Sequence, residues 1–314
     1  MPALRSELNR RARPVSYVTV LTSNEIVARL VDRRRAYGER GSATVAPIFE
    51  GEGWRLVDIL CSSDASDAAF EEQHDYVSIA LVMAGAFSYR SSAGSGDLCS
   101  GSVLLGGART RFSCTHKHGA GDRCIAFQFS PERYEELLSS LGASQAGTSF
   151  PRVALPVSTR GASLFARTEA LACGHASGSA HELALSTVSW VIEALGRFGR
   201  DRAPTLAQTQ SMLAVARAID ADVSGDHSVR TLAAAASMST FHFIRCFKRV
   251  VGTTPHAYVR IARLRAAGLL LCNPNLPIAS VAFEVGFQDL SVFNHAFRQT
   301  FGVTPRQLRA SIAS

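Results

Sequence analysis

The feature that most constrains the fold is a spaced pattern that occurs twice in the last third of the chain. The pattern reads F-x-x-x-F-K/R-x-x-x-G-x-T-P, and it runs from Phe243 to Pro255 and again from Phe293 to Pro305. Every matched position recurs 50 residues later. Agreement at so many spaced positions indicates a duplicated supersecondary unit.

Each copy carries the local signals of a helix that leads into another helix. The two phenylalanines share one helix face, Gly252 or Gly302 suits the left-handed position after a helix, and Thr-Pro suits the next helix start. A shorter helical stretch and a tight turn precede each phenylalanine pair, at 229–239 and 278–287. Two short helices joined by such a turn are typical of a helix-turn-helix unit.

The excess positive charge of the protein is concentrated in this same region. Residues 207–314 hold ten arginines and one lysine against five acidic residues, a net charge of +6, whereas the whole chain carries +7. Localised positive charge is typical of a domain that binds a polyanion, because each neutralised phosphate releases counterions. The charge and the duplicated unit together predict binding to double-stranded DNA.

The segment 207–314 resembles the DNA-binding domain of AraC/XylS-type transcription regulators, on the stretches 232–259 and 278–309 and on the helix that joins them. The resemblance implies two helix-turn-helix units, at about 228–252 and 277–302, held by one long helix. Over 255–272 that helix would be about 27 Å long. Such a spacer suits two reading helices set about 34 Å apart, in successive major grooves.

The resemblance and the helix faces together nominate the residues that contact DNA. The expected base-reading residues are Phe241, Ile244, Arg245, Ser291, Asn294 and His295, and the expected phosphate-binding residues are Lys248, Arg249 and Arg298. Arg245 suits guanine and Asn294 suits adenine, each with about 1–3 kcal/mol of discrimination.

Two residues depart from expectation. His295 stands where the family commonly has arginine or lysine, which makes readout there weaker or dependent on pH. Gly268 lies inside the joining helix, where it costs about 1 kcal/mol relative to alanine.

The first part of the chain is rich in short β-like runs separated by glycine, serine and aspartate. Such runs predict an all-β barrel or sandwich, and they resemble, more loosely, the cupin-like barrel that precedes this DNA-binding domain in many relatives. The predicted architecture is therefore α+β, with a cupin-like sensing domain at 1–150, a helical connector at 151–206 and the DNA-binding domain at 207–314. The sensed effector is a small molecule, a metal ion or a redox signal.

One short segment of the first domain carries metal-ligand residue types: Cys114, His116, His118 and Cys124. Two cysteines and two histidines suit a tetrahedral zinc-like ion, and His74 is a conceivable further ligand. The competing interpretation is a hairpin with a polar or partly buried edge, since the spacing is not that of a zinc finger.

Two amphipathic helices are expected in the connector, over 161–171 and 181–198. Their apolar stripes suit either a homodimer interface or the cover of the barrel within one chain. The stripes comprise Leu164, Phe165, Leu171, Leu183, Val188, Val191, Ile192 and Leu195.

Composition limits the remaining classes. The chain has 314 residues with 46% hydrophobic content, no apolar run near the about 20 residues of a membrane span, and no signal-peptide pattern. Its seven cysteines are scattered, as expected of reduced thiols in the cytoplasm.

The leading functional hypothesis is a sequence-specific transcription regulator that is not an enzyme, with promoter DNA, an effector, a second copy and RNA polymerase as partners. A metal-dependent cupin enzyme with a fused helical domain is the alternative, and a non-specific architectural DNA binder is the third hypothesis.

Overall fold

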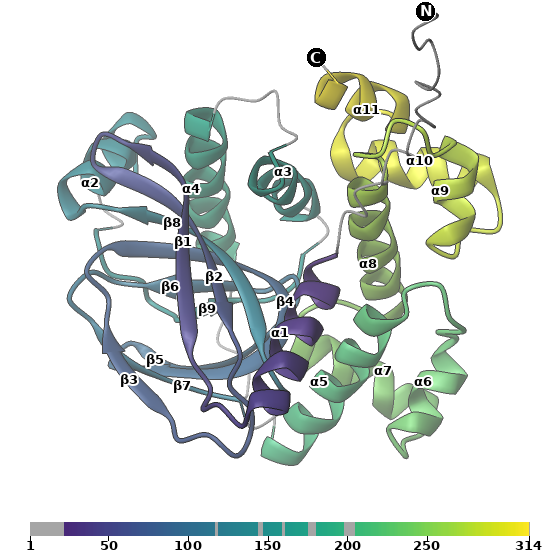
Figure 1. Cartoon of the computed structure of the whole chain (residues 1–314), viewed down its shortest axis with the longest axis horizontal. Helices are drawn as coiled ribbons and strands as arrows, with labels where there is room; N and C mark the ends of the chain where they lie inside the picture. Colours follow the sequence, from purple (N-terminus) through teal and green to yellow (C-terminus); the bar gives the residue numbers. More distant parts are fainter. Residues whose placement is uncertain are drawn as a thin grey trace, which may run out of the picture.

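The computed structural model describes residues 22–116, 119–143, 147–158, 161–174, 180–197 and 205–313. An antiparallel sheet domain with flanking helices is followed by a helical domain (Figure 1). This arrangement confirms the predicted α+β class. Among the described residues, no helix has both the length and the apolar character that a membrane crossing requires.

The sheet domain contains nine strands in the described residues: β1 (Ala43–Gly51), β2 (Trp54–Cys61), β3 (Phe70–Gln73), β4 (Val77–Ser91), β5 (Gly94–Cys99), β6 (Val103–Gly106), β7 (Arg111–Thr115), β8 (Asp122–Phe129) and β9 (Ala154–Leu155). They pair in the order β1-β2-β8-β4-β6-β9, while β5 and β7 pair with the second half of β4, and β3 pairs with β7. All of these pairings are antiparallel.

Strand β4 links the two groups of strands because it bends in its middle. It is one continuous strand with a register shift between Val82 and Ala84. Gly85 follows the shift at φ +85°, and a Cβ there would stand 2.3 Å from the carbonyl oxygen of Gly121. Only glycine allows this backbone approach.

The central strands are buried on both faces. In β8, Ile125 and Phe127 belong to the core under the helices, while Cys124 and Ala126 face the second group of strands. This double burial explains why these strands read as continuous apolar runs instead of alternating ones.

Helices α2 (Pro131–Ser140), α3 (Ala162–Ala172) and α4 (Ala180–Arg197) contribute to the larger core. The apolar stripes of α3 and α4 lie in or against that core, so they cover the sheet within the chain.

Helix α1 (Ser23–Tyr37) packs on β4 and β8. The structure buries Val27 and Val31 of this helix and leaves Ile26 and Leu30 half-buried. The reason is that α1 crosses Gly121, where a Cβ would meet Val27 and Val31 at 2.7 Å. This close approach of the Gly121 backbone determines which face of α1 is buried, although Gly121 lies almost a hundred residues from α1 along the chain.

The helical domain consists of α5 (Leu206–Ala221), α6 (Val229–Ala235), α7 (Thr240–Val251), α8 (Pro255–Leu270), α9 (Ile278–Glu284), α10 (Leu290–Phe301) and α11 (Pro305–Ala313). Helix α8 has 16 residues, about 24 Å of helix. It runs between α6–α7 at one end and α9–α10 at the other (Figure 1).

Candidate functional site

Helices α7 and α10 end at the glycines that the repeated pattern predicts. Ser239 caps α7 and Asp289 caps α10 through their side-chain oxygens, and each helix ends at a left-handed glycine. The phenylalanine pairs are fully buried, with ring centroids 5.6 Å apart in α7 and 5.5 Å apart in α10. Thr254-Pro255 then starts α8, with threonine as the cap.

The two helices bury and expose equivalent positions almost identically. From 241 to 250 and from 291 to 300, the pattern of buried and exposed residues differs only at Ile244, which is half-buried where Asn294 is exposed. The other five expected base-reading residues are exposed, as are the three expected phosphate-binding residues.

Two exposed apolar side chains stand out on these faces. Phe241 is 72% exposed and Val292 is 59% exposed, each at the start of its helix. The guanidinium carbon of Arg245 lies 5.6 Å from the Phe241 ring centroid. This contact restricts Arg245 before any ligand arrives.

The three expected phosphate contacts are not equivalent. The Lys248 and Arg298 side chains are exposed and form no hydrogen bond or ion pair with any other residue that the structure describes. Arg249 donates from Nη2 to Gln208 Oε1 of α5, at 2.8 Å. Arg249 would therefore exchange or share this bond in order to reach a phosphate.

The turn inside each helix-turn-helix unit places one residue in the left-handed region. That residue is Ser237 at φ +52° in the first unit and Gly286 at φ +90° in the second. Met238 N and Phe287 N then return to the carbonyl oxygens of Ala233 and Ala282.

Arg263 of α8 ties the second unit to the segment after α5, a role that sequence reasoning missed. Its Nη1 donates to Gly286 O at 2.9 Å, while Nε and Nη2 donate to the carbonyl oxygens of Val223 and Gly225. Three bonds from one guanidinium fix the turn of the second unit against the first half of the domain. The only sequence signal was an arginine among apolar neighbours.

A family model described as a helix-turn-helix domain matches residues 232–311, which run from α6 through α11. The C-terminal domain is an AraC-type helix-turn-helix domain. The known proteins that the chain resembles match only part of its length. The regulatory protein PocR of Salmonella typhimurium is 36% identical over 111 residues, 35% of this chain and 36% of that protein.

The HTH-type transcriptional regulator MtrA of Neisseria gonorrhoeae is 39% identical over 82 residues, 26% of this chain and 27% of that protein. The chain thus matches only about a third of the length of these relatives. Among solved structures, ToxT of Vibrio cholerae covers 84% of this chain and 100% of its own at 12% identity, with a TM-score of 0.35.

The AraC-type domain contacts the sheet domain through α5 and α8. Arg265 of α8 donates to Ser100 Oγ and to Met83 O of the sheet domain. Tyr258 of α8 donates to Ser100 O and also, within the AraC-type domain, to Asp220 Oδ2 of α5 at 2.7 Å. Burial, opposed by the charge of Arg265 and by the Tyr258 and Ser100 hydrogen bonds, raises the pKa of Asp220 to about 6.

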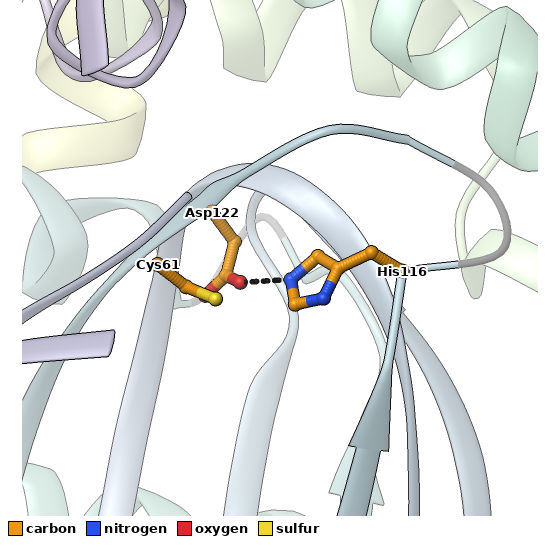
Figure 2. A group of neighbouring side chains, drawn as sticks. All are labelled: Cys61, His116 and Asp122. Carbon is orange, nitrogen blue, oxygen red and sulfur yellow. Dashed lines mark hydrogen bonds and ion pairs between the residues drawn. The ribbon is translucent and has the colours of Figure 1, made fainter. Parts of the chain in front are cut away.

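Of the expected metal ligands, Cys114, His116 and Cys124 are buried, but the ligand atoms that lie within 4.8 Å of one another in the described part of the chain belong to Cys61, His116 and Asp122. His118 lies outside the described residues. His116 Nε2 donates to Asp122 Oδ2 (Figure 2). His74 lies elsewhere, bonded to the Tyr89 hydroxyl and stacked on Phe112.

Two residues of this cluster, Cys61 and Asp122, were not among the ligands predicted from the sequence. Asp122 lies within the same short segment as Cys114 and Cys124. Cys61 ends β2 and is the register partner of Asp122 at the start of β8. Because strand register brings together positions far apart in the chain, no local signal marks Cys61.

Charge and burial act in opposite directions on His116. Burial lowers its pKa, but hydrogen bonds to Asp122 and Cys61 and their negative charges outweigh burial and raise the pKa to about 10. Burial also raises the pKa of the Cys114 and Cys124 thiols.

Proposed function

We propose that this protein is a transcription regulator that binds specific double-stranded DNA sequences through α7 and α10. The observation that carries the proposal is the matched exposure of these two helices at the ends of α8, in a domain with a net charge of +6. Because the exposed positions repeat after 50 residues, both helices offer a polar and basic face to the same ligand.

The spacing of the two units suits successive turns of DNA. Helix α8, about 24 Å long, separates reading helices that are themselves offset from its axis. Phe241, Ile244 and Arg245 of α7 and Ser291, Asn294 and His295 of α10 read base edges in this proposal. Lys248, Arg249 and Arg298 bind phosphates and fix the register without reading sequence.

The sheet domain senses an effector in this proposal, and the contacts of Arg265 and Tyr258 with it are the route to α8. A second copy of the chain and RNA polymerase are the further partners that such a regulator needs. The cytoplasm is the compartment where these partners meet.

The decisive experiment is selection of binding sites from random duplex DNA by the full chain. Arg245→Ala and Asn294→Ala are each expected to relax preference at one base position, at a cost of about 1–3 kcal/mol. Arg33→Ala on α1 is the control, because it removes one exposed charge that lies outside the AraC-type domain.

Wild-type protein is expected to bind the selected sites about 10³-fold or more tightly than random duplex. Equal affinity for both would favour a non-specific architectural binder. Unchanged preference in the Arg245 and Asn294 variants would show that other residues read the bases.

A further inference from the structure

One end of the sheet domain brings three different metal-binding side chains together. Cys61 ends β2, Asp122 begins β8 as its register partner, and His116 follows the last residue of β7. Their ligand atoms, Sγ, a carboxylate oxygen and a ring nitrogen, all lie within 4.8 Å of one another. All three residues are buried, and Figure 2 shows the side chains converging from separate strands.

The donor set and its spacing suit a borderline-soft divalent cation. Thiolate, imidazole and carboxylate are the zinc ligands of proteins, and neighbouring ligand atoms around tetrahedral zinc stand about 3.3–3.8 Å apart. His116 Nε2 and Asp122 Oδ2 are 2.5 Å apart. Small side-chain movements would therefore admit an ion at the centre of the three.

A second layer holds the carboxylate in place. The Cys124 thiol donates to Asp122 Oδ1 at 3.4 Å, which leaves Oδ2 directed at His116. Such outer bonds orient the ligands of metal sites. Cys114 of β7, two residues before His116, is also buried and belongs to the same buried cluster as Cys124.

Helix α1 packs over the backbone next to these three residues. Gly121, at φ +69°, lies against Val27 and Val31 of α1, and its N–H donates to Ser63 O beside the end of β2. This packing shields the side chains from water, and a buried charged set is stable only when its members are paired or bind an ion.

We propose that Cys61, His116 and Asp122 bind one zinc-like divalent cation. Binding displaces the thiol proton of Cys61 and the Nε2 proton of His116, and both are released to solvent. The ligand set differs from the one that sequence spacing suggested, since it takes Cys61 and Asp122 and places Cys124 behind the carboxylate.

The site also has a connection to the DNA-binding domain. Helix α1, which covers Gly121, donates from Asn24 Nδ2 to Asp220 O near the end of α5, at 2.8 Å. The cation is the effector of the regulator in our proposal, and this part rests on the proposed function.

The test uses the full chain, stripped with a chelator and then loaded with Zn²⁺ or Co²⁺. We expect one ion per chain by elemental analysis, and a thiolate-to-cobalt charge-transfer absorption with Co²⁺. Cys61→Ser and Asp122→Asn are expected to weaken binding at least about 100-fold, and Cys124→Ser about 10–100-fold.

Cys272→Ser is the matched control, because Cys272 is also a buried thiol, but it lies just after α8 and bonds to the Gly268 carbonyl of that helix. Circular dichroism checks that each variant folds. No cobalt–thiolate absorption in the wild-type protein would overturn the site without reference to any variant, and so would unchanged binding in folded Cys61→Ser.

Affinity for a selected DNA site, measured with and without Zn²⁺, separates the site from its regulatory role. A change of at least about 5-fold is expected of an effector. If the protein binds the metal but its DNA affinity does not change, the metal site stands and the effector role is refuted. Metal binding by a chain that binds no DNA would sink the proposed function alone.

Discussion

At the scale of single residues, the turn of each helix-turn-helix unit depends on one left-handed position. Gly286 holds it in the second unit, where its carbonyl accepts from Arg263, and Ser237 holds it in the first. A residue other than glycine costs free energy in the left-handed conformation in either unit. The two units therefore offer a matched pair of substitutions.

Gly286→Ala is expected to lower the free energy of unfolding by about 1–3 kcal/mol. The added Cβ would stand 2.9 Å from the Ser224 Cα and 3.0 Å from the Arg263 guanidinium carbon, in addition to the backbone cost at φ +90°. Chemical denaturation measures the loss. Ser237→Gly is the counterpart and should be neutral or stabilising, because it removes the left-handed cost. Equal stability of Gly286→Ala and wild type would contradict this account.

At the scale of elements, helix α3 crosses helix α8 at Gly268, a glycine inside a helix that the sequence did not explain. A Cβ on Gly268 would lie 3.6 Å from the Cβ of Ala166, an ordinary contact distance. The crossing requires a small residue there, but it does not require glycine.

Gly268→Ala is therefore expected to raise the free energy of unfolding by about 1 kcal/mol, since alanine is the better helix former. Thermal or chemical denaturation checks the gain, and Ala266→Gly in the same helix should show a loss of similar size. A destabilised Gly268→Ala variant would mean that α3 tolerates no added atom at this crossing.

At the scale of the whole molecule, the contact between the sheet domain and the AraC-type domain contains a partly buried acid, Asp220. Asp220 of α5 accepts from Tyr258 of α8, which also reaches the carbonyl of Ser100 in the sheet domain. The pKa of Asp220 is raised from 3.8 to about 6. At pH values between 3.8 and about 6, Asp220 is therefore mostly protonated in the folded protein and mostly ionised in the unfolded chain.

Stability should consequently depend on pH through Asp220. Between its unfolded and folded pKa values the folded state binds more protons, so the stabilisation is present at low pH and is lost as pH rises through about 6. Relative to Asp220→Asn, wild-type protein should gain about 1 kcal/mol of unfolding free energy between about pH 7 and about pH 5. Parallel denaturation of the two proteins at both pH values measures the difference, and a pH-independent difference would refute it.

The sequence alone determined the AraC-type domain in detail. Its caps, its left-handed glycines and its phenylalanine pairs act within a few residues of one another, so their spacing is visible along the chain and a second copy confirms the pattern. The exposed faces of α7 and α10 followed from the same spacing.

The contacts across the sheet, in contrast, follow from the three-dimensional arrangement of the strands and helices. Cys61 and Asp122 are partners through strand register, α1 turns Val27 inward because it crosses Gly121, and the stripes of α3 and α4 cover the sheet. Register and burial depend on contacts between distant segments, and these leave no periodic trace in the residues that take part.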